Sequence, residues 1–182
     1  ITADMRVILI AEDDSTIALD SKAQSRTLEI PASPILEPLT AERTLLLGWN
    51  RRAAMVATEL SRYVGPGSLL TIAADVPGIE AEVAGIHLAS DNLKVELHKV
   101  DTGRQADLAS LDPLTYDHVL VLGYSDHMGA QSADTRTLVS LLHLRRMEQA
   151  AGQDISIVSE MIDVRNRELA RVTSVDDFVV SN

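Results

Sequence analysis

The chain alternates between short apolar runs and longer segments in which apolar residues recur at helical spacing. This alternation is typical of consecutive βαβ units, which build a mainly parallel sheet with helices on both of its faces. We therefore predict an α/β fold of the Rossmann-like, doubly wound class with a six-stranded, mainly parallel sheet. The predicted strands cover residues 44–47, 69–74, 93–97, 119–122, 155–158 and 178–180.

Two of these strands indicate their own place in the sheet. The run 69–74 is continuously apolar, as expected for a strand that is covered on both faces. In the following strand, Leu93, Val95 and Leu97 alternate with polar residues, which predicts one face in contact with water. A strand of this kind belongs at or near an edge of the sheet, where the third strand of a doubly wound fold usually lies.

The segments between the strands contain helical patterns. The first predicted helix ends at the Gly-Pro-Gly breaker 65–67, and short helices are expected near 79–86 and 166–171. The longest helix is predicted to begin at Asp134, a good N-cap residue, and to end before Gly152, a good residue for the position after a helix.

The N-terminal part of the chain has a different pattern. Residues 5–10 form an apolar run that predicts a strand, whereas 21–42 contains three prolines and no sustained periodicity. We assign 1–42 to an N-terminal strand with a proline-containing linker, and 43–182 to the Rossmann-like domain. Because a strand-like run begins within a few residues of Ile1, we expect the sequence to be part of a longer protein.

Composition excludes several classes of function. The chain has no cysteine, which excludes disulfide scaffolds, thiolate metal sites and cysteine nucleophiles. Its 27 acidic and 16 basic residues give a net charge of -11, which disfavours binding to nucleic acid or to anionic lipid. The sequence has no continuous apolar run of the length that crosses a bilayer, ~18 residues. The five histidines lack metal-binding spacing, and Ser125 beside His127 lacks the G-x-S-x-G motif of hydrolases.

The turn after the first strand has the features of a phosphate-binding turn. An apolar strand turns at Gly48 directly into an amphipathic helix, so backbone N–H groups and the positive end of the helix dipole face the turn. In the pattern G-x-G-x-x-G/A, Gly48 takes the first position and Ala53 the third, while Asn50 replaces the second glycine. A plain strand-to-helix turn without a ligand is the alternative interpretation.

Charged residues stand at the other places where such a fold binds nucleotides. Asp75 follows the second strand, at the position of the acid that binds a ribose, and Asp101 and Asp126 follow the third and fourth strands. The guanidinium groups of Arg51 and Arg52 are placed to contact a phosphate. The alternative is that the acids are turn formers or caps and that the arginines are solvated.

Several segments together resemble the CASTOR and POLLUX ion channel family. They are Gly-Trp-Asn-Arg-Arg at 48–52, the strand ending at Asp75, and 132–138 followed by 141–145. The resemblance covers nearly the whole chain, and 8–14 looks like the last strand of a preceding regulatory repeat. The cytoplasmic part of that family is similar to domains that regulate the conductance of potassium channels and to nucleotide-binding subunits of Trk-type and Ktr-type transporters.

The resemblance implies roles for individual residues. Glu160 falls on a carboxylate that binds Ca²⁺ in some calcium-gated relatives, although by its sequence alone it is equally an ion-pair partner. The other positions are expected to contact NAD or an adenine nucleotide. They are Gly48, Asn50 and Arg51 at the phosphates, Asp75 at the ribose, Asp101 on the adenosine side, and Gly123 and Asp126 after the fourth strand.

We therefore expect a ligand-sensing gating domain of an ion channel or potassium transport system. The resemblance implies a homo-oligomer like a gating ring, attached to a membrane pore domain at the cytoplasmic face, with no catalytic residue and no nucleic-acid partner. Two alternatives remain open from the sequence. One is a fragment of an NAD-dependent oxidoreductase, and the other is a Rossmann-like scaffold that binds no ligand and only assembles.

Overall fold

The computed structural model of the chain describes residues 39–166 and 177–180, the latter by their backbone. These residues belong to the compact unit Glu37–Asn182. The predicted strand at 5–10, the linker up to residue 38 and most of the predicted short helix at 166–171 lie outside the described residues.

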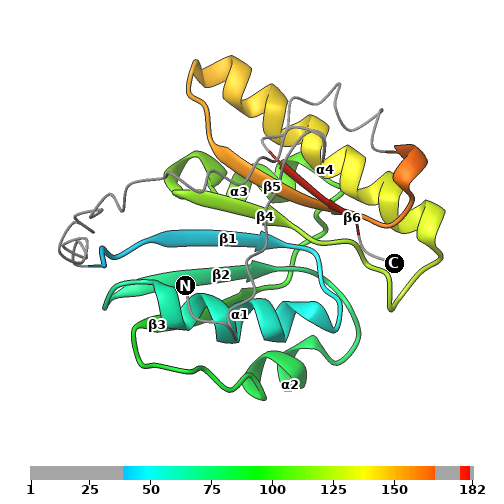
Figure 1. Cartoon of the computed structure of the whole chain (residues 1–182). Helices are drawn as coiled ribbons and strands as arrows, with labels where there is room; N and C mark the ends of the chain where they lie inside the picture. Colours follow the sequence, from blue (N-terminus) through cyan, green and yellow to red (C-terminus); the bar gives the residue numbers. More distant parts are fainter. Residues whose placement is uncertain (1–38, 167–176, 181–182) are drawn as a thin grey trace, which may run out of the picture. The chain divides into compact units, whose positions relative to one another are not determined.

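The centre of the domain is a parallel sheet with the strand order β3-β2-β1-β4-β5-β6. Every pairing in it is parallel, and Leu47 at the end of β1 lies between Ala73 of β2 and Val121 of β4 (Figure 1). The predicted Rossmann-like α/β class with a parallel sheet is confirmed, and β3 lies at an edge as predicted. Five strands have described side chains: β1 Arg43–Leu47, β2 Ser68–Ala73, β3 Leu93–His98, β4 His118–Val121 and β5 Ser156–Met161, and the backbone of β6, Asp177–Val180, pairs with β5.

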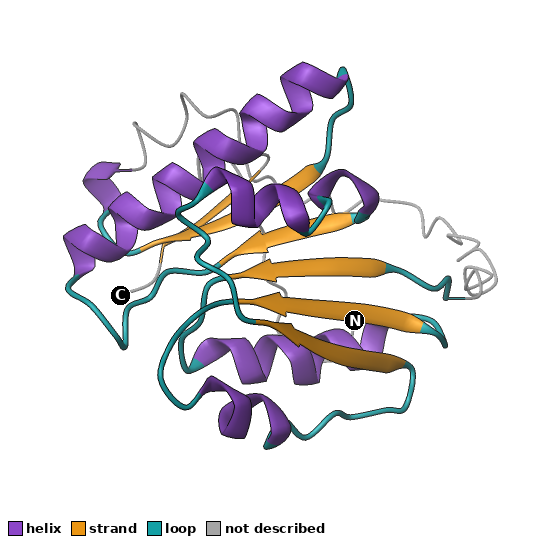
Figure 2. Cartoon of the chain, turned by 180° about the vertical axis from the view of Figure 1, so that it is seen from behind, coloured by secondary structure: helices purple, strands orange, loops and turns teal. Residues whose placement is uncertain are grey.

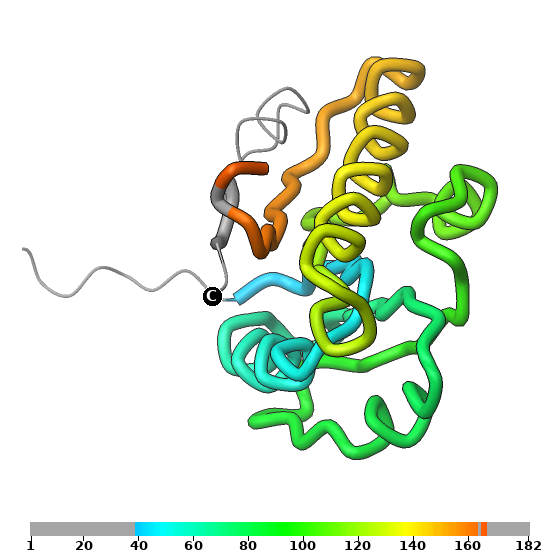
Figure 3. The backbone as a smooth tube through the Cα atoms, turned by 90° about the vertical axis from the view of Figure 1, so that its right-hand side faces the viewer, coloured from blue at the N-terminus to red at the C-terminus, as the bar shows by residue number. Residues whose placement is uncertain are grey.

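Helices cover both faces of the sheet (Figure 2). One face carries α1 and α2, and the other carries α3 and the long α4, which the side view separates from α1 (Figure 3). Within the described residues, no helix is both long enough and apolar enough to cross a membrane. The helices are α1 Arg52–Tyr63, α2 Ile79–Ala84, α3 Gln105–Ser110 and α4 Ala130–Ala151, with short 3-10 turns at Pro113–Thr115 and Val164–Asn166.

The two layers follow from alternation along β1, since successive side chains on a strand point to opposite faces. Leu46 packs with Ala53 and other residues of the α1 side. Leu45 and Leu47 pack with Leu141 and other residues of the α4 side. All of these side chains are fully buried, so the β1 strand fixes the turn that follows it between two apolar cores.

Two helix predictions differ from the structure. The helix α3 was not predicted, because it has only six residues and a single buried apolar side chain, Leu108, which gives no helical pattern. The start of α4 was predicted wrongly at Asp134, whereas the helix begins at Ala130 after Gly129 in an extended conformation. Asp134 is instead buried within α4, and its carboxylate accepts hydrogen bonds from the backbone N–H groups of Ile162 and Asp163 at 2.8 and 2.9 Å.

Candidate functional site

The turn at Gly48 allows no side chain. Its φ is +89°, and a Cβ at this position would lie 2.1 Å from the carbonyl oxygen of Leu122, just beyond β4. Gly48 donates its N–H to Ala73 O at 3.0 Å, and Leu122 donates to Leu47 O at 2.8 Å. The predicted sharp turn at Gly48 is therefore confirmed, and its cause is the close approach of β1, β2 and the segment after β4. A role of Gly48 in ligand binding stays a prediction.

Asn50 connects this turn to the ends of two other strands. Its side chain is 1% exposed, and Nδ2 donates to Gly123 O at 2.8 Å and to Glu160 Oε2 at 2.7 Å. Its Oδ1 accepts from the backbone N–H of Arg52 at 2.9 Å. The residue that replaces the second glycine thus directs its amide towards Gly123, after β4, and Glu160, in β5.

Glu160 is a buried member of the same network. Its carboxylate accepts from the backbone N–H of Gly123 at 3.0 Å, from Asn50, and from the guanidinium of Arg52, which forms an ion pair with Oε1. Glu160 therefore forms an ion pair, one of the two roles left open by the sequence, and its binding of Ca²⁺ stays a prediction. Ca²⁺ prefers about six to eight oxygen ligands, and no group of three or more His, Asp or Glu side chains that could hold a metal occurs in the described part.

The N–H groups at the start of α1 already have acceptors within the protein. The N–H of Arg51 donates to the carboxylate Oδ2 of Asp126 at 2.6 Å, and the N–H of Ala53 donates to Asn50 O at 2.9 Å. Both Arg51 and Asp126 are exposed, unlike the buried Asn50. An exposed carboxylate therefore occupies the position at this helix terminus where an anionic ligand would bind.

Trp49 ties the same turn to α2. It is the only tryptophan of the chain and is 1% exposed. Its indole Nε1 donates to Glu82 Oε2 at 2.6 Å. Sequence reasoning gave Trp49 no role, although a large aromatic residue directly after the turning glycine was the available signal.

Asp101 lies in a separate group of residues after β3. It accepts from Arg136 Nη2 of α4 at 2.5 Å and from the N–H of Gly103 at 3.0 Å. The Arg136 guanidinium stacks 4.5 Å from the centroid of the Tyr124 ring, and the Tyr124 hydroxyl bonds with Thr102 Oγ1 at 2.9 Å. Burial raises the pKa of the Tyr124 phenol above its ordinary value of 10.0, so it stays neutral at physiological pH.

Arg136, Tyr124 and Thr102 were missed as site residues. Arg136 is within the segment 132–138 that carries the family resemblance, but nothing in its spacing connects it to Asp101.

Asp75 is exposed beyond the end of β2 and forms no hydrogen bond within the described residues. A hydrogen bond to Glu80 raises the pKa of Lys99, and the charge of Asp75 adds to this shift, which places Asp75 within electrostatic range of that amine. The predicted positions therefore divide into a buried group, an exposed pair and two separate acids. They are Asn50 with Gly123 and Glu160, Arg51 with Asp126, Asp101 with Arg136, and Asp75.

Comparisons with known proteins identify relatives among ion channels. No family model matches the chain. The chain is 27% identical over 211 residues to a probable ion channel POLLUX of Arabidopsis thaliana, an alignment that covers 97% of this chain and 25% of the channel. It is also 27% identical over 210 residues to the ion channel CASTOR of Lotus japonicus, covering 97% of this chain and 24% of the channel. The chain thus spans about a quarter of the length of these relatives.

A solved structure with the same fold is the human SLO3 gating ring, with a TM-score of 0.53 at 10% identity. That match covers 76% of this chain and 24% of the gating-ring chain, and it supports the Rossmann-like fold alone. The sequence matches agree with the resemblance that residues 48–52, 132–138 and 141–145 indicated. Over nearly its whole length, the chain is homologous to a segment of CASTOR and POLLUX ion channels.

Proposed function

We propose that this chain is a ligand-sensing regulatory domain of a CASTOR/POLLUX-type ion channel. The observation that carries the proposal is the match of 97% of the chain to about a quarter of each channel. The chain folds as an α/β domain of the nucleotide-binding class. None of the helices that the structure describes is suited to cross a membrane. A domain of this kind senses a ligand and acts on a pore formed elsewhere in the channel. No catalytic step is assigned to it.

The ligand site in this proposal is the exposed pair of Arg51 and Asp126. A phosphate group of NAD or an adenine nucleotide replaces the Asp126 carboxylate at the N–H of Arg51, where the 2.6 Å contact indicates a strong, charge-assisted hydrogen bond. The exchange is feasible because both residues are exposed, so the released carboxylate is solvated at once. Asp75, which forms no hydrogen bond within the described residues, is available to accept from the ribose hydroxyls.

Exchange at Asp126 links the ligand to the rest of the domain. Asp126 stands in the segment between β4 and α4, so its release alters the loop that leads into the longest helix. The buried network of Asn50, Gly123 and Glu160 holds the base of the turn and is not expected to change. A ligand gates a channel only if it binds more tightly to one of the two arrangements of the domain. We further propose that the domain assembles as a homo-oligomer at the cytoplasmic face, next to the pore.

One observation favours a second function, a scaffold that binds no ligand. The N–H groups of Arg51, Arg52 and Ala53 all have acceptors within the protein, and Asn50 fills the place of a glycine. If Asp126 stays in place against every nucleotide, the domain serves for assembly only.

Calorimetric titration separates the two functions. NAD, NADH, ATP, ADP and Ca²⁺ are added in turn to the wild-type chain and to Arg51→Ala, Asp75→Ala and Asp126→Asn. The sensing domain binds one of the nucleotides, Asp75→Ala weakens this binding about tenfold by removing a charged acceptor, and Asp126→Asn strengthens it by removing the competing carboxylate. The scaffold function holds instead if no titrant binds. Binding of a nucleotide that none of the three substitutions changes would contradict the assignment of the site to Arg51, Asp75 and Asp126.

A further inference from the structure

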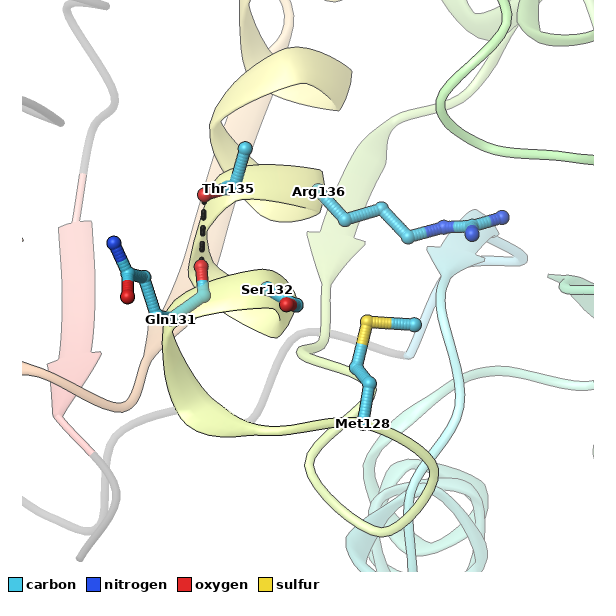
Figure 4. Close-up of a pocket in the computed structure, with 5 residues that line it drawn as sticks. All are labelled: Met128, Gln131, Ser132, Thr135 and Arg136. Carbon is cyan, nitrogen blue, oxygen red and sulfur yellow. Dashed lines mark hydrogen bonds between the residues drawn. The ribbon is translucent and has the colours of Figure 1, made fainter.

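A cavity of about 410 Å³ opens beside the first turns of α4, and its lining includes no residue of the network around Glu160. It is lined by Met128, Gln131, Ser132, Thr135 and Arg136 (Figure 4). In Figure 4, Arg136 and Met128 extend to one side of the helix and Gln131 to the other, with Ser132 between them. The volume is within the range of sites for small molecules, about 300–1,000 Å³.

The lining combines one cation with neutral polar groups and one flexible apolar group. Ser132 and Gln131 form no side-chain hydrogen bond within the described residues, whereas Thr135 donates its hydroxyl to Gln131 O at 2.8 Å. Met128 contributes a thioether, which adapts to irregular apolar surfaces. Among the residues that the structure describes, no acidic side chain lines the cavity, although the chain as a whole carries a net charge of -11.

The Arg136 guanidinium is held in place, but not every one of its nitrogen atoms has a close hydrogen-bond acceptor within the described residues. Its stacking on Tyr124 at 4.5 Å fixes the plane of the guanidinium, and Nη2 bonds to Asp101 at 2.5 Å. Nε has only a long contact of 3.5 Å with Thr102 Oγ1, and Nη1 forms no hydrogen bond within the described residues. Stacking on an aromatic ring limits the orientations that the guanidinium can adopt.

The partner Asp101 is replaceable by an external anion. Its side chain is 42% exposed and that of Arg136 is 26% exposed, so water and solutes reach the ion pair. An exposed ion pair of this kind contributes little to stability, because both charges are well solvated when apart. The Asp101 carboxylate therefore competes with solutes for Arg136 and does not permanently neutralise it.

From these observations we infer that the cavity is an anion site, in which Arg136 binds the phosphate group of a small molecule and Asp101 is displaced. Ser132 donates to a remaining phosphate oxygen, and Met128 contacts the apolar part of the ligand. Neither Arg51 nor Asp126 lines this cavity, and the inference does not depend on the proposed function. A free phosphate ion and a phosphorylated metabolite share this chemistry, so the test contains both.

The test is calorimetric titration of the chain with inorganic phosphate and, separately, with AMP. The wild type and Arg146→Gln, which changes an exposed arginine of the same helix, bind equally. Arg136→Gln weakens binding about tenfold by removing a charge-assisted hydrogen bond. Asp101→Asn strengthens binding, because the internal competitor loses its charge. A purely structural role of the ion pair predicts no gain of affinity in Asp101→Asn.

Further variants and ligands test three points: whether the variants fold, whether binding occurs at the other proposed site, and which class of ligand binds. Arg136→Lys keeps the charge but loses the stacked guanidinium, so its binding is weaker than that of the wild type and tighter than that of Arg136→Gln. A urea unfolding transition of Arg136→Gln like that of the wild type excludes misfolding as the cause of its loss. Arg51→Ala retains phosphate binding at this cavity even where it abolishes nucleotide binding at the turn of Gly48. In Arg51→Ala, tighter binding of AMP than of phosphate that is lost on adding Arg136→Gln identifies a phosphorylated metabolite, and equal binding of the two identifies free phosphate. Equal affinities of the wild type and Arg136→Gln, or no gain in Asp101→Asn, overturn the inference.

Discussion

At the scale of single residues, Gly48 and Asn50 have opposite roles in one turn. Gly48 is required because it has no side chain, since a Cβ at this position would collide with the backbone of Leu122. Asn50 is required for its amide, which satisfies a buried carboxylate and a buried carbonyl group. A buried polar group without a partner costs about 1–3 kcal/mol. The turn therefore depends on its backbone geometry at one position and on a side-chain network at the other.

The cost of a side chain at Gly48 is measurable against a second glycine with the same backbone conformation. Gly78 has φ +80° and open space within 4 Å of where a Cβ would stand, whereas Gly48 has φ +89° and a backbone oxygen at 2.1 Å from that position. Gly78→Ala is expected to lower the free energy of unfolding by about 1 kcal/mol, from its φ alone. Gly48→Ala is expected to lower it by more than about 3 kcal/mol, because the backbone of Leu122 must also move. Urea unfolding measures both, and equal losses would show that the contact with Leu122 is relieved without cost.

At the residue scale, the sequence predicted those residues whose amino-acid type alone indicates their structural role. Glycine at a strand-to-helix turn is such a residue, and Gly48 was identified correctly as the turning point. The bond from Asn50 to Glu160 was not predicted, because 110 positions separate them and only the strand order brings them together. The pairing of Arg136 with Asp101 was missed for the same reason, since it joins the loop after β3 to α4.

At the scale of elements, the strands and the short helix α2 were predicted closely, whereas the six-residue helix α3 was not predicted. A buried strand such as β2 is a continuous apolar run that ends at recognisable breakers. The six-residue helices α2 and α3 are too short to be stable alone and are held by contacts with the rest of the domain. For α4, the residue type of Asp134 suggested a cap, but its carboxylate instead holds the loop that follows β5.

Helix α2 provides a test of this dependence on tertiary contacts. Glu82 accepts from the buried indole of Trp49, whereas Glu80 on the same helix pairs with the exposed amine of Lys99. Glu82→Ala is expected to destabilise the domain by about 1–3 kcal/mol, because the indole N–H loses its acceptor. It is also expected to shift the emission of Trp49, the only tryptophan, to longer wavelength. Glu80→Ala is the matched control and should leave the emission unchanged; an identical shift in both variants would assign it to general loosening of α2.

At the scale of the whole domain, the candidate residues lie together at the carboxyl ends of the parallel strands. Asn50, Asp75, Asp101 and Asp126 follow β1, β2, β3 and β4, and all four strands are parallel, so their carboxyl ends face the same side. The sequence predicted this edge as the binding region from the βαβ pattern alone. It did not predict that Asn50, Asp101 and Asp126 already form hydrogen bonds with other residues of the domain, because such pairs form only in the folded domain.

The chain matches ion channels over about a quarter of their length, and the function proposed for this domain is an effect on a pore. The exchange of Asp126 for a phosphate is useful only if the channel responds to it. The most direct measurement is the open probability of the full-length protein in a planar bilayer, before and after addition of the nucleotide that binds the isolated wild-type domain. We predict that the nucleotide changes the open probability, and that Asp126→Asn shifts the response to lower nucleotide concentration. An open probability that is the same with and without bound nucleotide would contradict the account.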